Sequence, residues 1–184
     1  ASLSSPGKLA TDEEGNVFIV DPPLIRKVDT AGIISTVAGN GSTPSVGDPK
    51  DVAVDGNGNV FVADQTNHII LKIDTNEVST IVAGTGQQGS SGDGGPATSA
   101  ELKFPQAITL DAAGALYIGE DGGLRKVDAS GTITTIYAGG IVDAIAVSDS
   151  SGNVFAATSG QVLLITPSGG GSRGRRKSRS GRTD

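Results

Sequence analysis

The feature that most constrains the fold of this chain is an internal repeat. Four segments align with one another, and each carries a glycine followed three residues later by an aromatic side chain. The glycines are Gly15, Gly58, Gly114 and Gly152, and the aromatics are Phe18, Phe61, Tyr117 and Phe155. Self-similarity with a period of roughly 40 residues indicates that one supersecondary unit is copied along the chain. We therefore expect the aromatic to be one core position that is used four times.

Each copy is predicted to contain four short β-strands. β-branched residues dominate, turn residues recur at short intervals, and no stretch shows a sustained helical period. In the second copy the expected strands cover residues 51–54, 59–64, 69–74 and 78–83. Four antiparallel strands in a repeat of this length are typical of a propeller blade. The predicted fold class is all-β, a partial or open β-propeller of about four four-stranded antiparallel blades.

Aspartate and glycine at a fixed spacing mark the turn between the first two strands of a blade. We expect the aspartate to bond the turn backbone and the glycine to take a positive φ. The pairs are Asp12 with Gly15, Asp55 with Gly58, and Asp111 with Gly114. A calcium loop at Asp55 is the alternative, but Val60 and Thr66 stand where that motif needs glycine and glutamate. The spacing therefore favours a structural role.

A lysine and an aspartate two residues apart recur on the third strand of three copies. They are Lys27 with Asp29, Lys72 with Asp74, and Lys126 with Asp128. Residues two apart in a strand share a face, so the pattern predicts ion pairs.

The composition excludes several kinds of site. Cysteine is absent and His68 is the single histidine, which removes disulfides, thiolate metal centres and sites that need two imidazoles. No GxSxG sequence surrounds a serine, and the glycine-rich stretch at 84–103 lacks the lysine of a phosphate-binding loop. No apolar run reaches the length that spans a bilayer. We predict that this segment is not an enzyme and has no cofactor or metal site.

Charge is distributed unevenly along the chain. Residues 172–184 carry six basic side chains and one acid, so the other 171 residues have a net charge of −11. An acidic body opposes the phosphate backbone of nucleic acids, and we predict no nucleic-acid binding by the blades. The tail, residues 169–184, is expected to be a flexible Gly/Ser/Arg-rich extension. A protease site at RGRR, a kinase site at RRKS and nucleic-acid contact are its alternatives.

Two stretches resemble a known family. Residues 48–74 resemble an NHL repeat, and GDGGPA at residues 92–97 is similar to the GDGGPA-bearing subset in bacterial and algal surface proteins and teneurin-like propellers. The resemblance covers residues 1–168. It implies propeller blades at approximately 1–47, 48–104, 105–140 and 141–168.

The two ends of the repeat array suggest a fragment. Ala1, Leu3 and Pro6 match Ala100, Leu102 and Pro105, and the last expected strand is replaced by the basic tail. We expect a segment of a larger propeller protein with no membrane insertion of its own. Its open blade edges allow self-association.

Acidic residues end the second strand of three copies, at Asp21, Asp64 and Glu120 with Asp121. Related propeller hydrolases hold metals with rim acids, but an aspartate before a turn more often bonds the backbone. We predict the backbone role. We also expect His68 to pack structurally, and the loop at 84–103 to lie compactly over the joint between two blades.

The predicted function is a non-enzymatic scaffold that binds a protein or glycan partner. Its candidate interaction surface is Gln65, Thr66, Asn67, His68, Gln87, Gln88 and Asp93. A metal-assisted lyase or lactonase, or a sugar sensor completed by further blades, is the alternative. A structural subunit that pairs through open edges is a second one. The resemblance implies an extracellular or cell-surface location, with the cytoplasm as the other possibility.

Overall fold

The computed structural model describes residues 2–39, 41, 45–148 and 151–166. The basic tail and the expected replacement of the last strand lie outside these ranges, so those predictions stay predictions. Within the described residues the chain folds into four antiparallel sheets, three with four strands and one with three. The single helical element in the described ranges is the one-turn 3₁₀ helix η1, Ala97–Ser99. No described helix is long and apolar enough to span a membrane.

Each sheet is a simple meander in which consecutive strands pair. The first blade contains β1 (Leu9–Thr11), β2 (Val17–Asp21), β3 (Leu24–Val28) and β4 (Ile34–Ala38). The second contains β5 (Pro49–Val54), β6 (Val60–Asp64), β7 (Ile69–Ile73) and β8 (Ser79–Ala83). The third contains β9 (Ala107–Leu110), β10 (Leu116–Glu120), β11 (Gly123–Val127) and β12 (Ile133–Ala138). The fourth contains β13 (Val142–Val147), β14 (Val154–Thr158) and β15 (Gln161–Ile165). The predicted all-β propeller fold is confirmed, and the strands of the second blade lie within two residues of their predicted ranges.

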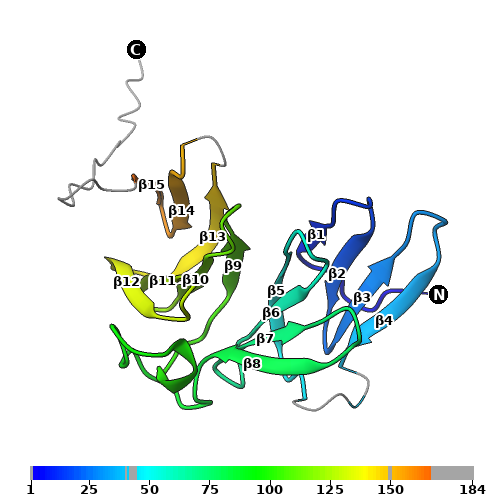
Figure 1. Ribbon diagram of the computed structural model, residues 1–184, viewed down its shortest axis with the longest axis horizontal. Coiled ribbons are helices and arrows are strands. Elements are labelled where there is room, and N and C mark those ends of the chain that lie inside the picture. The colour runs from blue at the N-terminus through cyan, green and yellow to red at the C-terminus, as the bar shows by residue number, and fades with distance from the viewer. Residues whose placement is uncertain (1, 40, 42–44, 149–150, 167–184) are drawn as a thin grey trace.

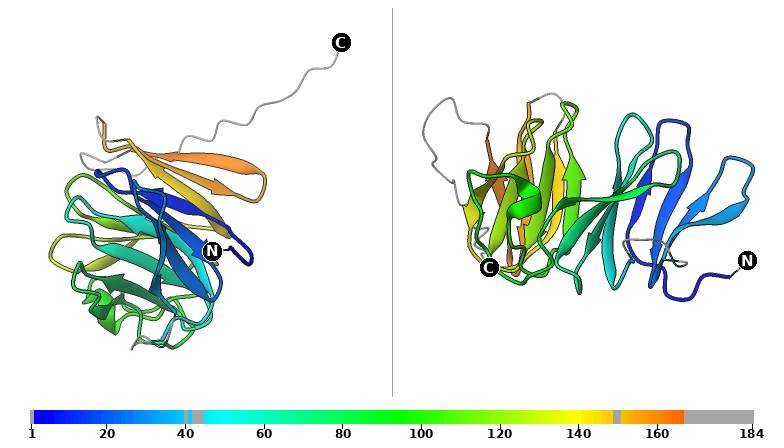
Figure 2. Two further views of the ribbon diagram at one scale, coloured as in Figure 1. Left: turned by 90° about the vertical axis from the view of Figure 1, so that its right-hand side faces the viewer. Right: turned by 60° about the horizontal axis from the view of Figure 1, so that its bottom comes forward.

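The four blades stand side by side around a common axis (Figure 1). Their first strands, β1, β5, β9 and β13, face this axis, and neighbours among them are in contact. The right-hand view of Figure 2 shows the upright sheets next to one another. This places one turn-bearing rim at each end of the strands.

The core consists of apolar layers between successive blades. Phe18 and Ile25 of the first blade share a buried cluster with Val62 and Leu71 of the second. Similar clusters join the second blade to the third and the third to the fourth. Because strand side chains alternate between faces, each inner blade buries both faces of its sheet.

Three of the four repeated aromatics are buried as predicted. Phe18, Phe61 and Tyr117 are 3%, 8% and 4% exposed, whereas Phe155 is 41% exposed. The prediction was wrong for Phe155, because it lies on the face of the fourth blade that no described blade covers.

The turn prediction is confirmed. The Asp55 carboxylate accepts hydrogen bonds from the backbone N–H of Asn57 and Asn59 and from the Asn59 side chain. Asp12 and Asp111 bond their turns in the same way. Gly15, Gly58 and Gly114 have φ values of 87°, 77° and 80°.

The predicted ion pairs on the third strand are wrong. Lys27, Lys72 and Lys126 lie over the rings of Phe18, Phe61 and Tyr117, at 5.3, 5.8 and 5.0 Å from the centroids. Each lysine is directly opposite its aromatic in the register of the second and third strands. Asp29, Asp74 and Asp128 instead bond the next turn. Each of these aspartates lies one residue beyond the end of its strand, where its carboxylate accepts hydrogen bonds from the turn.

Candidate functional site

The acidic residues that end the second strands are structural clips. Asp21 Oδ1 accepts hydrogen bonds from the backbone N–H groups of Ser4 and Ser5, both at 2.7 Å. The other two clips bond the equivalent segments before their own blades. Asp64 binds Gly47 and Asp48, and Glu120 binds Lys103 at 2.8 Å. The predicted backbone role is confirmed for these three acids, and it fixes the chain where it enters each blade. It is wrong for the Asp121 carboxylate, which pairs with Lys103 Nζ at 3.1 Å.

Glu120 is the most perturbed of these acids. It is 3% exposed, and its Oε1 lies 3.8 Å from Arg125 Nε. Burial raises the pKa of Glu120 to about 7, against the opposing effects of the Lys103 N–H and the Arg125 guanidinium. A carboxyl group with this pKa exchanges its proton near neutral pH.

The turn after β6 carries four of the predicted surface residues. The Asn67 side chain donates to Asp64 Oδ2 at 2.8 Å and to Ser45 O at 3.2 Å, so it ties the turn to the segment before the blade. Thr66 is exposed, and Gln65 is half-buried. This turn therefore presents polar side chains on a backbone that is held in place.

His68 has the structural role that was predicted. It has a φ of 53°, and its ring packs edge-on against Phe104 with the centroids 4.9 Å apart. Its Nδ1 accepts a hydrogen bond from the Phe104 N–H at 3.3 Å. His68 thus connects the turn after β6 to the end of the loop at 84–103.

The loop at 84–103 packs over the joint between the second and third blades, as predicted. Ala97, Ala100 and Leu102 are nearly fully buried in the cluster that these two blades share. Gly84 has a φ of 94°, and a Cβ there would lie 2.3 Å from the His68 carbonyl oxygen. Only glycine permits the loop to run this close to the neighbouring turn.

Arg125 on β11 is the anchor of this loop. Its side chain is 2% exposed, and it donates to the carbonyl oxygens of Glu101 and Ser91 at 2.8 and 3.0 Å. Its Nε and Nη2 both donate to Asp93 Oδ1, at 3.1 and 2.7 Å. A planar guanidinium can satisfy several acceptors in one loop at once. One side chain of the third blade therefore holds the loop.

Asp93 completes the anchor. Its Oδ2 accepts a hydrogen bond from the Thr135 N–H at 2.8 Å, although the side chain is 43% exposed. Burial opposes its ionisation, but the bonds from Thr135 and Arg125 outweigh this and hold the pKa of Asp93 below its ordinary value. Both of its carboxylate oxygens therefore bind the third blade.

The seven predicted surface residues fall into two groups. The turn after β6 lies next to the start of the loop, since a Cβ on Gly86 would be 3.7 Å from Asn67 O. Gln87 and Gln88 are exposed, and Gln88 forms a bridge with Leu102. Six of the residues therefore belong to the rim at the joint of the second and third blades. Asp93 belongs to the Arg125 anchor.

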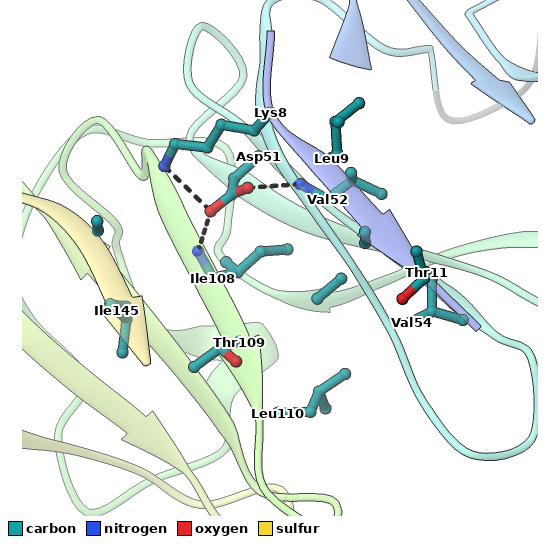
Figure 3. A pocket seen from close by; sticks show the side chains of 13 residues that line it. Lys8, Leu9, Thr11, Asp51, Val52, Val54, Ile108, Thr109, Leu110 and Ile145 are labelled. Atoms are coloured by element: carbon teal, nitrogen blue, oxygen red, sulfur yellow. Dashed lines mark hydrogen bonds and ion pairs between the residues drawn. The ribbon is translucent and has the colours of Figure 1, made fainter. Parts of the chain in front are cut away.

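A cavity of about 430 Å³ lies on the axis of the propeller, lined by the first strands of all four blades (Figure 3). Lys8 Nζ is its polar centre, at 3.1 Å from Asp51 Oδ2, 3.0 Å from Gln106 O and 2.8 Å from Asp143 O. These four residues come from four different blades. One ammonium group therefore connects the whole arc.

The carboxylate of Asp51 is the other charged group of the cavity. Its oxygens also accept hydrogen bonds from the N–H groups of Ile108 and Val52, at 2.9 and 3.0 Å. Burial raises the pKa of Asp51 above its ordinary value, and the Lys8 ammonium opposes this shift. Thr11 and Thr109 add hydroxyl groups to the lining. Within the described ranges no three acidic or histidine side chains lie close enough together to hold a metal ion.

Arg125, Lys8 and Asp51 are candidate functional residues that were not predicted from the sequence. Lys8 and Asp51 precede equivalent apolar residues of β1 and β5, where the third and fourth blades have Ala107 and Ala144. A charged residue at an otherwise small, axis-facing position was the available signal. Arg125 gave no such signal, because its acceptors lie on a loop more than 20 residues away.

Comparison with protein families supports the fold at the level of sequence. The family model of the teneurin NHL domain matches residues 1–48 and 79–151. Teneurin-3 of Danio rerio is 30% identical over 152 residues, and teneurin-m of Drosophila melanogaster is 30% identical over 148. Each alignment covers 73% of this chain and 5% of the relative. The chain therefore spans a small part of the length of these relatives.

Solved structures of similar fold come from diverse proteins. A streptogramin B lyase superimposes with a TM-score of 0.67 and 18% identity, covering 88% of this chain and 51% of its own. A gluconolactonase from Xanthomonas campestris gives 0.69 and 15%, covering 90% and 58%. A chain of a nidogen/laminin complex gives 0.67 and 16%, covering 86% and 59%. At these identities the likeness concerns the propeller fold alone.

Proposed function

Because this chain belongs to the teneurin NHL domain family, we propose that it is a non-enzymatic interaction module whose rim binds a protein or glycan partner. The proposed binding surface, called the rim surface here, consists of Gln65, Thr66, Asn67, His68, Gln87 and Gln88. Asp93 extends it at the Arg125 anchor. The proposed location is extracellular or at the cell surface, because the similarity to teneurins implies it.

The observation that carries the proposal is the fixed backbone under exposed polar side chains. Asp64 and Asn67 hold the turn after β6, and Arg125 holds the adjoining loop. Thr66, Gln87 and Gln88 remain exposed on this frame. A partner that binds here orders little backbone, so less of the contact energy is lost to conformational entropy.

The chemistry of the rim surface favours an uncharged polar partner. Carboxamide and hydroxyl groups both donate and accept hydrogen bonds, which suits peptide backbone or sugar hydroxyls. The acidic body of the chain, with a net charge of −11 outside residues 172–184, disfavours phosphate-rich partners. A protein or glycan therefore fits better than a nucleic acid.

The test uses a phage-displayed peptide library and a glycan array with the full chain as bait. Ligands should lose binding to a T66A/Q87A/Q88A variant, because the main exposed donors and acceptors are removed. A matched variant, N57A/T75A, changes exposed polar residues of the opposite rim and should retain binding. If the ligands bind both variants equally, the rim surface is not the binding site.

The axial cavity supports a second candidate, a propeller enzyme or sugar sensor. Lys8, Asp51 and two threonine hydroxyls line a space large enough for a small polar molecule. Turnover of a streptogramin or a gluconolactone by the full chain, abolished in D51N, would favour this candidate over the scaffold. A stoichiometric calcium or zinc site in calorimetry would do the same.

The third candidate is an assembly subunit that pairs through its uncovered blades. Leu9 on the first blade and Phe155 and Val162 on the fourth are 61%, 41% and 62% exposed. Exposed apolar side chains on uncovered sheet faces favour association between copies of the chain. Sedimentation equilibrium over a concentration series tests it, and a monomer throughout would exclude it.

A further inference from the structure

One register position on the third strand differs between blades in an informative way. Arg26, Leu71 and Arg125 are equivalent, because each pairs with the matching residue of the second strand, at Ile19, Val62 and Ile118. Leu71 and Arg125 lie on the face of the sheet that is directed toward the preceding blade, and Arg26 lies on the equivalent face of the first blade. The side chain at this position therefore contacts the segment that precedes the first strand of its blade, where that segment covers the face.

In the two inner joints the residue at this position matches the segment that covers it. Leu71 is fully buried in the same apolar cluster as Val46, which lies in the short segment before the second blade. Arg125 is buried under the loop at 84–103, where its acceptors are Asp93 and two backbone carbonyls. An apolar residue therefore accompanies a short apolar segment, and an arginine accompanies a glycine-rich acidic loop.

The first blade has the arginine but no covering loop among the described residues. Arg26 is half-buried, and the hydrogen bond of its side chain runs from Nε to Ser35 O at 3.1 Å. Thr36 is opposite Arg26, as Thr135 is opposite Arg125. In the third blade this threonine N–H is the second donor to Asp93.

The apolar surroundings of Arg26 are also those of Arg125, but uncovered. Leu9 is 61% exposed, whereas its equivalent, Ile108, is 5% exposed. Ile34 is half-buried, and its equivalent, Ile133, is fully buried. The two faces thus have the same arrangement of an arginine and apolar side chains. Of the two, only the face on the third blade is covered by a loop and a neighbouring blade.

We propose that this face of the first blade, called the Arg26 face, binds a Gly-Asp-Gly-Gly loop of another propeller blade. The aspartate of that loop pairs with the Arg26 guanidinium and the Thr36 N–H, and its small apolar residues cover Ile34. The partner is defined by this chemistry: one carboxylate flanked by glycines and followed by proline and alanine. The proposal concerns a surface other than the rim surface and does not depend on it.

The experiment titrates a synthetic peptide with the sequence of residues 88–103 into the full chain, by calorimetry and by NMR of the labelled protein. Saturable binding with shifts at Arg26, Ile34 and Thr36 is expected. Arg26→Leu should weaken binding tenfold or more, since a charge-assisted pair is lost. The Leu71 position shows that leucine is compatible with the strand.

Two controls separate the Arg26 face from general charge and from misfolding. Lys27→Gln removes a positive charge from the opposite face of the same strand and should leave affinity unchanged. A peptide with Asp93→Asn leaves the protein untouched and should bind as weakly as the wild-type peptide binds the Arg26→Leu variant.

Three results would overturn the proposal. They are no saturable binding at millimolar peptide, binding that ignores both Arg26→Leu and the Asp93→Asn peptide, and shifts confined to the rim surface or the axial cavity. A dimer in sedimentation that neither the peptide nor Arg26→Leu disturbs would also overturn it, because a second copy would then cover the face.

Discussion

The Arg26 face of the first blade and the equivalent face of the third blade have nearly the same sequence and opposite environments. The third strands read IRKV and LRKV, and the fourth strands begin ISTV and ITTI. Arg125 and Ile133 are 1% and 0% exposed, whereas Arg26 and Ile34 are only half-buried. Strands of nearly the same sequence can therefore present the same side chains on a face. Whether those side chains are buried depends on the neighbouring blade and loop.

The largest expected difference concerns the two arginines. Arg125→Leu should lower the free energy of unfolding by roughly 3 to 5 kcal/mol, because two backbone carbonyls and the Asp93 carboxylate lose a buried donor. Arg26→Leu should change it by less than about 1 kcal/mol, because Arg26 is only half-buried and one side-chain hydrogen bond, to Ser35 O, is lost. Urea denaturation of both variants measures this. If both variants lost the same free energy of unfolding, the hydrogen bonds of Arg125 to the loop would not contribute to stability.

Two isoleucines compare the faces without charge. Ile133→Ala should cost about 3 kcal/mol, because truncation leaves a cavity in a packed cluster. Ile34→Ala should cost about 1 kcal/mol, since the side chain is partly in water already. Thermal and urea unfolding give both values. A cost for Ile34→Ala as large as that for Ile133→Ala would mean that the first blade is covered in solution.

Glu120 should give the third blade a pH dependence. Its pKa is raised from 4.5 to about 7 in the fold, so both states are protonated below pH 4.5. Above that pH the unfolded chain loses the proton first, and the free energy of unfolding should fall by up to about 3 kcal/mol until it levels off above pH 7. The difference between wild type and Glu120→Gln across pH 4 to 8 isolates this effect. A constant difference would contradict the raised pKa.

The smallest effect should be the same in both blades. Lys27 and Lys126 lie over aromatic rings on the opposite faces of their sheets, which are covered in both blades. Lys27→Met and Lys126→Met should each cost about 0.5 to 1 kcal/mol, the usual range for a partly exposed cation–π contact. The 3.8 Å ion pair of Lys126 with Asp111 should add little, because the lysine is partly exposed to water. Chemical denaturation of the pair provides the measurement. A clear difference between them would show that the two blades differ beyond the Arg26 face.

Much of the fold was predictable because its signals are local. The repeat, the Asp-Gly turns and the acids at strand ends depend on residues within about one blade, and they were identified correctly. The ion pairs on the third strand failed for a related reason. Lysine and aspartate were considered along one strand, whereas the partner of Lys126 is Tyr117 on the adjacent strand.

The candidate sites were only partly predictable. The turn at Gln65–His68 and the loop at 84–103 stood out as irregular polar segments, and the structure places their junction at one rim. The Lys8 contacts could not be predicted, since they join residues up to 135 positions apart and include backbone carbonyls. Every residue has a backbone carbonyl group, so the sequence does not indicate which of these groups accepts a hydrogen bond from Lys8.

Three features follow from the order of residues alone: the antiparallel blades, the positions of the turns, and the alternation of side chains between the two faces. These follow from steric preferences and from the two-residue period of a strand, which are local properties. Three others required the folded arrangement of the blades: which of two similar faces is buried, which arginine holds a loop, and the contacts of one lysine with the other three blades. These outcomes depend on distances between segments far apart in the chain, because burial and ion pairing are set by the groups that surround a side chain in space.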